Sequence, residues 1–441
     1  MKGQTDPLTP EAFKDQCAAL SIAPPFTIAV SGGRDSMGLA LLAAKAFPDD
    51  RHKITALTVD HGLRPDAADE ARRVAQWCKA LGLRHETLLW DGHKPQTGLQ
   101  EAARNARYRL IVEATIAAGA KVTLTAHSAD DQAETVFMRL RRGAGVAGLA
   151  AMRERTKIAA GPSDAITLAR PLLEATRAQL TALCHQYDQD FVNDPSNDDP
   201  TYERVRVRAL MAALEEQDLL TGDALRRTAA HLSRAEDATR AAEEQLFLDL
   251  QGCFYASGCA SVDGFASTAG AGGLYRRLIF AVSGAQYAPG ADEALLAVKT
   301  AWEKGAAAVN GALIRRWRDE IWFMREPAAL LGRAGVSPMT EAAFPPNGRL
   351  LWDNRFIIEI EHTRADLAAK LMVRPFGAEK SLPSHDTAAR RGQPAEIAWT
   401  APAIYDENQL LAAPLPLAPD HPSIRLRALA EERFSGAIIR F

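Results

Sequence analysis

A short loop, SGGRDS at residues 31–36, carries the residue types that hold a polyphosphate. Its two adjacent glycines let the backbone approach an anion closely, and a helix that starts there offers unpaired N–H groups. Asp35 would repel bare phosphate, so its presence predicts a Mg²⁺ ion between them. The other interpretation is a tight strand-to-helix turn that is capped by serine or aspartate. The expected nucleotide-binding residues of the loop are Ser31, Gly32, Gly33, Arg34, Asp35 and Ser36, with Asp35 also the expected metal ligand.

A second block, HSADDQAETVFMRLRRGAGVAGLAAM at residues 127–152, opens with a group of carboxylates. Ser128 followed by Asp131 predicts the start of a helix, on which Asp130 and Glu134 share one face. Such a group of carboxylates can hold a cation, either Mg²⁺ or an ammonium group. The alternative is that the acids only favour the helix N-terminus through its dipole, which explains one or two of them more easily than three.

Basic residues follow the carboxylates along the chain. Arg104 and Arg107, one helical turn apart on an earlier segment, extend the same positive group. Beside a nucleotide site, such a group is a candidate contact for RNA phosphates, whereas the alternative is an ordinary solvated surface. The basic residues of the run are Arg139, Arg141, Arg142, Arg153, Arg155 and Lys157. The one acidic residue in the run is Glu154.

The first ~130 residues alternate β-rich and helix-like stretches, which indicates a parallel sheet covered on both faces. Ligands of such folds bind beyond the carboxyl ends of the strands. The strands are expected at residues 26–30, 53–61, 83–90 and 121–126, and the helices at residues 36–46, 67–80 and 99–118.

After about residue 209 the regular alternation of strands and helices ends. Residues 209–250 read as long helices with more helix to about Trp302, residues 311–326 as a strand pair, and the remainder as short strands. We therefore expect an α/β fold in which a Rossmann-like parallel sheet is followed by a helical middle domain and a small C-terminal α+β domain. The expected boundaries are residues 1–210, 211–330 and 350–441, with a linker near residues 332–348.

Composition limits the class of protein. The chain has 441 residues, a net charge of −3 and five scattered cysteines with no CxxC pair, so a disulfide scaffold and a cysteine-held metal are not expected. There is no apolar run of the ~18 residues that a membrane helix requires and no apolar signal core at the N-terminus. We expect a cytoplasmic protein with no membrane partner.

The two blocks together resemble a known family. SGGRDS resembles the pyrophosphate loop (SGGxDS) of N-type ATP pyrophosphatases, whose fold is adenine nucleotide alpha hydrolase-like. Residues 127–152 closely resemble the signature HxxDDQAETxxMRLxRGxGxxGLxxM of the tRNA(Ile)-lysidine synthetases. Further similarity lies in VDHGLRPDAADEA (residues 59–71), LQEAARNARY (99–108), RPLL (170–173) and DPSNDDPTYERVRVR (194–208). The resemblance covers about residues 26–210 and weakens after that.

The resemblance implies an activity. Members of the family use ATP to adenylate the carbon-2 oxygen of the wobble cytidine of the tRNA(Ile) with anticodon CAU, and free L-lysine then displaces AMP. The implied cofactors are ATP and Mg²⁺, and the implied partners are this tRNA and lysine, with a homodimer also allowed for. The C-terminal domain would contact the acceptor stem.

The resemblance also assigns site residues. Asp60 and His61 would help to hold adenine, but it stays open which carboxylate binds metal and which binds lysine. The implied catalytic residues are Asp35, Asp130, Asp131 and Glu134, and the implied tRNA-binding residues are Arg104, Arg107, Arg139, Arg142, Arg204 and Arg208.

Two other functions fit part of the pattern. A tRNA thiolase of the same superfamily would need cysteines for sulfur relay or for a cluster, and no cysteine lies beside a matched motif. A regulatory ATP-binding module would not need the carboxylates at Asp35, Asp130, Asp131 and Glu134.

Overall fold

The computed structural model divides the chain into two units. Unit 1 comprises Met1–Asp237 with Ile438–Phe441, and unit 2 comprises Ala238–Ala437. The expected division into residues 1–210, 211–330 and 350–441 remains a prediction. The structure describes residues 8–62, 67–91, 94–95, 98–159, 165–192, 199–332, 341–344, 348–360, 371–378, 393–407, 409–414, 417–418, 421–436 and 438–439.

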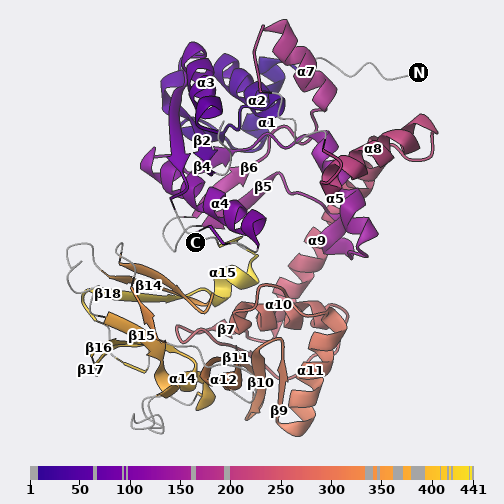
Figure 1. The fold of residues 1–441 in the computed structure, drawn as a ribbon. Helices are drawn as coiled ribbons and strands as arrows, with labels where there is room; N and C mark the ends of the chain where they lie inside the picture. Colours follow the sequence, from indigo (N-terminus) through magenta and orange to yellow (C-terminus); the bar gives the residue numbers. More distant parts are fainter. Residues whose placement is uncertain are drawn as a thin grey trace. The chain divides into compact units, whose positions relative to one another are not determined.

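Unit 1 is built on a mostly parallel sheet (Figure 1). Its strands lie in the spatial order β19-β5-β6-β4-β1-β2-β3. They are β1 (Phe26–Ala29), β2 (Ile54–Asp60), β3 (Arg84–Leu89), β4 (Val122–Leu124), β5 (Arg155–Ala159), β6 (Ala165–Ala169) and β19 (Ile438–Ile439).

Helices cover both faces of this sheet. In Figure 1, α2 and α3 lie on one side of the strands and α4 lies on the other. The first three residues of β1 are buried and the strand is mainly apolar, with Thr27 as its one hydroxyl residue, because both of its faces are covered. The helices of this part are α1 (Pro10–Ala19), α2 (Arg34–Ala46), α3 (Ala67–Ala80), α4 (Leu99–Ala117), α5 (Ala129–Arg141), α6 (Val146–Leu149), α7 (Arg177–Gln186) and α8 (Glu203–Glu216), with a 3-10 turn, η1 (Arg51–Lys53). Helix α9 (Gly222–Asp249) contains the boundary between the units.

The strand order reverses at β1, and this reversal positions the candidate site. β1 pairs in parallel with β2 on one side and with β4 on the other. The segments that follow β1 and β4 therefore leave the sheet next to each other at its carboxyl edge. Ligands of open α/β sheets bind in the crevice at such a switch point. The phosphate loop follows β1, and the carboxylate-bearing helix α5 follows β4.

The sequence predicted these first elements well, and the four strands and three helices expected before residue 130 are confirmed within a few residues. The pair β5 and β6 was not predicted. These strands are antiparallel to each other, and β6 extends the sheet beside β4.

Unit 2 combines helices with antiparallel sheets. The expected strand pair at residues 311–326 is confirmed as β10 and β11, but the middle region is less purely helical than expected because these strands join a larger sheet. The sheets are ordered β7-β8-β11-β10-β9, β12-β15-β16-β17 and β13-β14-β18. The strands are β7 (Cys253–Phe254), β8 (Ala260–Asp263), β9 (Ala306–Val309), β10 (Ala312–Trp317), β11 (Glu320–Arg325), β12 (Ala342–Ala343), β13 (Arg349–Trp352), β14 (Phe356–Ile360), β15 (Leu371–Pro375), β16 (Pro402–Asp406), β17 (Gln409–Ala412) and β18 (Ile424–Ala428). The helices are α10 (Ala271–Ser283), α11 (Ala291–Lys304), α12 (Pro327–Leu331), α14 (Glu396–Trp399) and α15 (Ala430–Phe434), with the 3-10 turn η4 (Phe376–Ala378).

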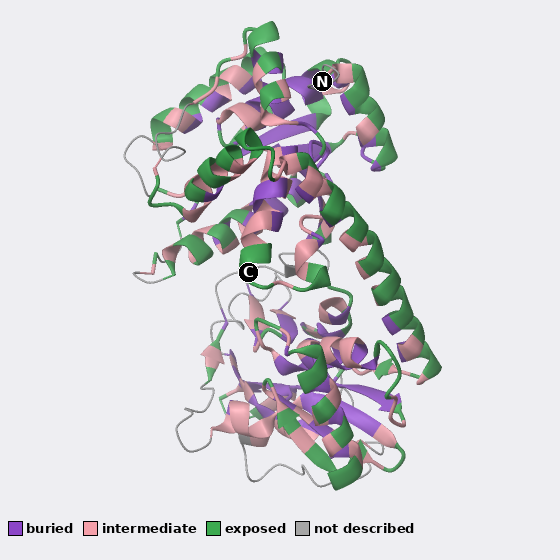
Figure 2. Cartoon of the chain, turned by 90° about the vertical axis from the view of Figure 1, so that its right-hand side faces the viewer, coloured by how far each residue is buried: buried purple, intermediate pink, exposed green. Residues whose placement is uncertain are grey.

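Each unit has its own apolar core. Figure 2 shows buried residues concentrated on the strands, while the helices present exposed outer faces. In unit 1 the core gathers around β1 and the Ala- and Leu-rich helix α2. In unit 2 it gathers around α10 and the sheet that contains β10 and β11. Of the helices that the structure describes, none combines the length and apolar character needed to cross a bilayer.

Candidate active site

The phosphate loop joins β1 to α2, and its own side chains shape it. The Ser36 hydroxyl donates to the Gly33 carbonyl at 2.8 Å and accepts from the Ser31 backbone N–H at 3.2 Å. Gly33 is the N-cap of α2 and has no side chain to satisfy the first N–H groups of the helix. The loop therefore leaves helix N–H groups available to an anion, as the sequence predicted.

Gly32 has the backbone conformation that only glycine adopts easily. Its φ is +86°, and a Cβ atom built there would lie 2.7 Å from Cγ2 of Val74 and 3.3 Å from Cγ2 of Val192. The Gly32 carbonyl also accepts a hydrogen bond from the Val192 N–H at 2.8 Å. The loop is thus held against α3 and the segment after α7, and it has no room for a larger residue.

We expect Gly32→Ala to weaken ATP binding by about tenfold or more. The added methyl group would displace the loop, so that its N–H groups no longer point at the phosphates. The left-handed strain alone costs about 1–2 kcal/mol. Gly119→Ala is the matched control, because Gly119 also has a positive φ (+71°) but meets nothing within 4 Å. Both affinity for ATP and the free energy of unfolding should be measured. Equal ATP affinity in the two variants would contradict the assigned role of the loop.

Helix α5 begins with the capping arrangement that the sequence predicted. The Asp131 N–H donates to the Ser128 hydroxyl at 3.3 Å, and the Ser128 N–H donates to the Asp131 carboxylate at 2.9 Å. Asp131 is therefore part of the helix cap. Because β1 and β4 are paired, this cap lies beside the phosphate loop.

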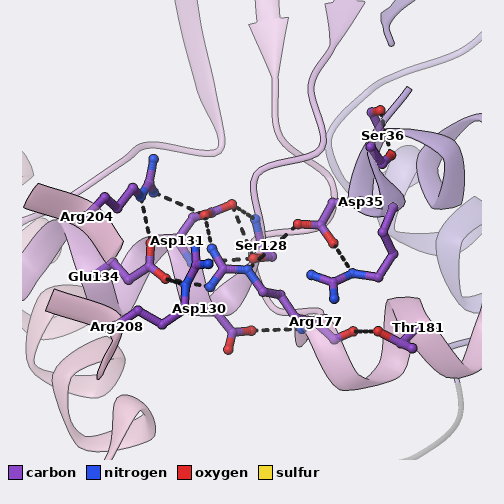
Figure 3. Close-up of polar contacts among 12 residues, drawn as sticks. Asp35, Ser36, Ser128, Asp130, Asp131, Glu134, Arg177, Thr181, Arg204 and Arg208 are labelled. Atoms are coloured by element: carbon purple, nitrogen blue, oxygen red, sulfur yellow. Dashed lines mark hydrogen bonds and ion pairs between the residues drawn. The ribbon is translucent and has the colours of Figure 1, made fainter. Parts of the chain in front are cut away.

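Arg177, which the sequence reasoning did not identify, connects the predicted carboxylates (Figure 3). It is the first residue of α7, and its backbone N–H donates to the Asp130 carboxylate at 2.8 Å. Its guanidinium donates to Glu134 at 2.5 Å and to Asp131 at 2.6 Å. Its Nε lies 3.8 Å from Oδ2 of Asp35. One arginine thus spans the phosphate loop and the carboxylate helix.

The sequence contained only a partial signal for Arg177. Thr176 and Gln179 form a capping box, so the T-x-x-Q pattern marks where α7 begins. Nothing in that pattern indicates that the first N–H of α7 faces a carboxylate 47 positions earlier in the chain.

Two arginines of α8, expected on the basis of the resemblance to contact tRNA, also lie on the carboxylates. Arg204 donates from Nε to Glu134 at 2.6 Å and from Nη2 to Asp131 at 3.0 Å. Arg208 donates from Nε to the other oxygen of Glu134 at 3.0 Å. Glu134 therefore accepts hydrogen bonds from three guanidinium groups.

These contacts keep the carboxylates ionised. Burial alone would raise the pKa of Asp131, but the charges of Arg177 and Arg204 outweigh it, and the pKa is lowered. The pKa of Glu134 is also lowered. Burial would raise it, but the hydrogen bond from Arg177, together with the charges of Arg177 and Arg204, outweighs the effect of burial. Both groups are negative throughout the neutral pH range.

The expected adenine-binding residues lie at the carboxyl end of β2, with Asp60 as its last residue and His61 directly after it. Asp60 accepts a hydrogen bond from the Gly62 N–H at 2.7 Å and so holds the turn, while the His61 ring lies edge-on to Trp90 with ring centres 5.9 Å apart. Nε2 of His61 lies 3.4 Å from Nη2 of Arg107. Burial and the charge of Arg107 lower the pKa of His61, so its ring is neutral at pH 7. The structure thus brings His61 and Arg107 together.

The other four arginines expected to contact tRNA do not lie on the carboxylates of α5. Arg104 and Arg107 are exposed on the first turns of α4, at the carboxyl edge of the sheet. Arg142 lies at the other end of α5, where it and Arg141 pair with Glu203. Arg139 donates to the backbone carbonyls of Gly148 at 2.7 Å and Ala151 at 3.0 Å, so part of its hydrogen-bonding capacity supports the loop after α5.

The residues fit a Mg²⁺ ion that is bound mainly through substrate. Among the described residues, no group of three or more His, Cys, Asp or Glu side chains could hold a metal by itself. Mg²⁺ commonly binds through one or two carboxylates plus substrate phosphates. Asp35, on the phosphate loop, has the hard oxygen ligands that this mode requires.

The chain is similar in sequence to known proteins. A family model described as a PP-loop domain matches residues 11–214. The tRNA(Ile)-lysidine synthase of Ruegeria pomeroyi is 33% identical over 411 residues, which cover 90% of this chain and 90% of the relative. That of Bradyrhizobium diazoefficiens is 48% identical over 236 residues, covering 53% of this chain and 63% of the relative. That of a Bradyrhizobium sp. is 50% identical over 190 residues, covering 43% and 52%. The chain thus matches between half and two thirds of the length of these last two relatives.

Proposed function

Because the chain belongs to the tRNA(Ile)-lysidine synthase family, we propose that it is an ATP-dependent ligase that joins free L-lysine to carbon 2 of a cytidine in tRNA. The cytidine is the wobble base of the tRNA(Ile) with anticodon CAU. The observation that carries the proposal is the placement of a phosphate loop and a carboxylate helix on adjacent strands of one sheet edge. The first group binds ATP, and the second binds a cation beside it.

The first step that we propose is adenylation. The carbon-2 oxygen of the cytidine attacks the α-phosphorus of ATP, and the bond to pyrophosphate breaks. The loop from Ser31 to Ser36 holds the phosphates through its N–H groups and hydroxyls. Asp35 would hold Mg²⁺, which neutralises developing negative charge on the phosphates when it is bound. Asp60 and His61 lie at the end of the neighbouring strand β2, where they would border the adenine.

The second step is attack by lysine. Its ε-amine forms a bond to carbon 2, and the bond from carbon 2 to the adenylate oxygen breaks, so that AMP leaves. Lysine arrives as an ammonium ion with a side-chain pKa near 10.4, and it must lose a proton before it can attack. Asp130 and Glu134 are our candidates for attracting the ammonium and accepting or relaying that proton. Asp131 is committed to the helix cap, which favours a supporting role.

The proposal is tested by incubating the protein with ATP, labelled lysine and a tRNA(Ile) transcript. Label should enter the RNA only when ATP is present and only when the anticodon is CAU. A transcript in which the wobble cytidine is replaced by uridine is the matched control. No incorporation with the CAU transcript would refute the proposed activity.

A thiolase activity is less well supported. Sulfur relay needs a thiol with a lowered pKa and access to substrate. Burial instead raises the pKa of Cys17 and Cys78 to about 12 and that of Cys184 to about 11. The described cysteines of unit 1 are all buried.

We further propose that Arg104, Arg107 and Arg142 contact tRNA phosphates. Arg139 would contribute through the guanidinium N–H groups that do not bond to the carbonyls of Gly148 and Ala151. Replacing Arg104, Arg107 and Arg142 by Gln should make log Kd for tRNA less dependent on log[salt] by about 2–3 units of slope, since about three phosphate contacts are lost. The control is a triple Gln variant of Lys53, Arg84 and Lys121, which lie where β2, β3 and β4 begin, at the opposite sheet edge. An equal change of slope in both variants would assign these arginines to the general surface.

The acceptor-stem contact of the C-terminal domain, a homodimer and a cytoplasmic location are part of the same proposal.

A further inference from the structure

The carboxylate that we propose to bind lysine is already surrounded by arginines in the free protein. Glu134 accepts from Arg177, Arg204 and Arg208, and Asp131 accepts from the first two of these. Only 3% of the Glu134 side chain is exposed. An incoming ammonium group would have to displace a guanidinium to reach it (Figure 3).

The charges in this network balance. It contains the carboxylates of Asp35, Asp130, Asp131 and Glu134 and the guanidiniums of Arg34, Arg177, Arg204 and Arg208. Counted over these contacts, four negative groups face four positive ones. A lysine cation therefore gains little from entering while all four arginines are in place, because no excess negative charge attracts it.

The arginines differ in their access to solvent. The side chains of Arg204 and Arg208 are 43% and 41% exposed, whereas that of Arg177 is 16% exposed. Because the side chains of Arg204 and Arg208 reach solvent, another anion can compete for them, although Glu134 itself is only 3% exposed. Arg177 is held more firmly, since its backbone N–H and its side chain both bind carboxylates.

We propose that RNA phosphate draws Arg204 and Arg208 away from Glu134 and Asp131, and that the exposed carboxylates then take the lysine ammonium. This inference rests on the proposed function and adds a regulation to it. Removing two positive groups leaves four carboxylates with two guanidiniums, a net charge of −2 in the network that favours a cation. Lysine then binds well only when RNA is present, which protects the enzyme from occupying its site without a substrate base.

RNA is favoured over ATP as the source of this phosphate. Of the three arginines that contact Glu134, Arg177 is the one that also faces the ATP loop, through its contact with Asp35. Arg204 and Arg208 come from α8, and both contact Glu134, which lies one helical turn further along α5 than the cap beside the loop. Guanidinium groups bind carboxylate and phosphate oxygens alike in a bidentate manner. Arg204 and Arg208 are therefore suited to bind first the carboxylates of α5 and then an RNA phosphate.

The inference is tested by measuring labelled lysine binding by equilibrium dialysis without ATP, so that no transfer occurs. Saturating tRNA(Ile) transcript should tighten lysine binding to the wild-type protein by about tenfold, within the usual range of coupling between two sites. The Arg204→Gln, Arg208→Gln double variant should bind lysine about tenfold more tightly than wild type without RNA, and RNA should then add less than twofold. Coupling is reciprocal, so lysine must tighten RNA binding to the wild type by the same factor.

Arg206→Gln is the matched control. Arg206 lies on the same helix, but among the described residues its guanidinium donates to the carbonyls of Pro200 and Thr201 and to no carboxylate. This variant should behave like wild type. Should the double variant fold poorly, Arg208→Gln removes one of the contacts to Glu134 and should give an intermediate gain in lysine affinity.

The outcomes separate this inference from the proposed function. If wild-type protein transfers labelled lysine to tRNA but the double variant binds lysine no more tightly than wild type, the inference is overturned and the function stands. If an ATP analogue that cannot be split between its α- and β-phosphates tightens lysine binding as much as RNA does, RNA is overturned as the source of the phosphate. If wild-type protein transfers no lysine, the proposed function itself fails.

Discussion

Asp35→Asn should reduce tRNA-dependent ATP–pyrophosphate exchange by about 10²-fold or more, with the fold unchanged. Removing one group that positions charge at a phosphoryl centre typically has an effect of this size. Asp35 lies on the first turn of α2, where its carboxylate contacts Arg34 at 2.8 Å and faces Arg177 at 3.8 Å. Asparagine keeps the shape of the side chain but lacks the charge that a Mg²⁺ ion requires.

The control for this prediction is Asp49→Asn, which removes an exposed carboxylate before β2, at the opposite edge of the sheet. Exchange should be measured over a range of Mg²⁺ concentrations, and the midpoint of unfolding should be recorded for both variants. An Asp35→Asn protein with normal exchange at normal Mg²⁺ would remove Asp35 from the metal site.

Glu134→Gln should raise the lysine concentration needed for half-maximal transfer by about 10²-fold, while at least part of the pyrophosphate exchange remains. Exchange requires ATP and tRNA but not lysine, so it reports the first step alone. The lost interaction is a charge-assisted hydrogen bond to the ammonium and the proton acceptor beside it. Structural damage should be limited, because the glutamine oxygen can still accept from the buried Arg177, while the half-exposed Arg204 and Arg208 can turn to solvent.

Glu113→Gln is the control for this variant, since Glu113 lies on α4 and pairs only loosely with Arg109 at 3.8 Å. Asp130→Asn gives a second test. An asparagine oxygen can still accept the hydrogen bond from the Arg177 N–H, so α7 keeps its cap while the charge is lost. If either variant loses exchange but binds lysine normally, that residue belongs to the adenylation step and our assignment is wrong.

The extent to which the sequence predicted the site depends on the range of each interaction. Local patterns predicted the phosphate loop and the Ser128–Asp131 cap, because their hydrogen bonds join residues only three to five positions apart. The alternation of strands and helices also predicted a parallel sheet, and a family model for the PP-loop domain supports the same fold.

Long-range contacts could not be predicted in the same way. The proximity of the loop to α5 follows from the pairing of β1 with β4, which joins segments that are almost 100 residues apart. Arg177 and Arg204 reach the same carboxylates from different helices, and no periodicity in the sequence indicates this. The basic residues from Arg139 to Lys157 form one run in the sequence, and their charge does not indicate that Arg139 donates to the backbone carbonyls of Gly148 and Ala151.

The most direct measurement of the central proposal is the mass of the modified nucleoside. The tRNA(Ile) transcript should be incubated with protein, ATP and lysine, then digested to nucleosides and analysed by mass spectrometry. We predict one cytidine whose mass has increased by one lysine less one water, present only with the CAU anticodon and absent when arginine replaces lysine, because a guanidinium stays protonated. An unchanged wobble cytidine, or lysine attached only at the 3′ end of the RNA, would contradict the account.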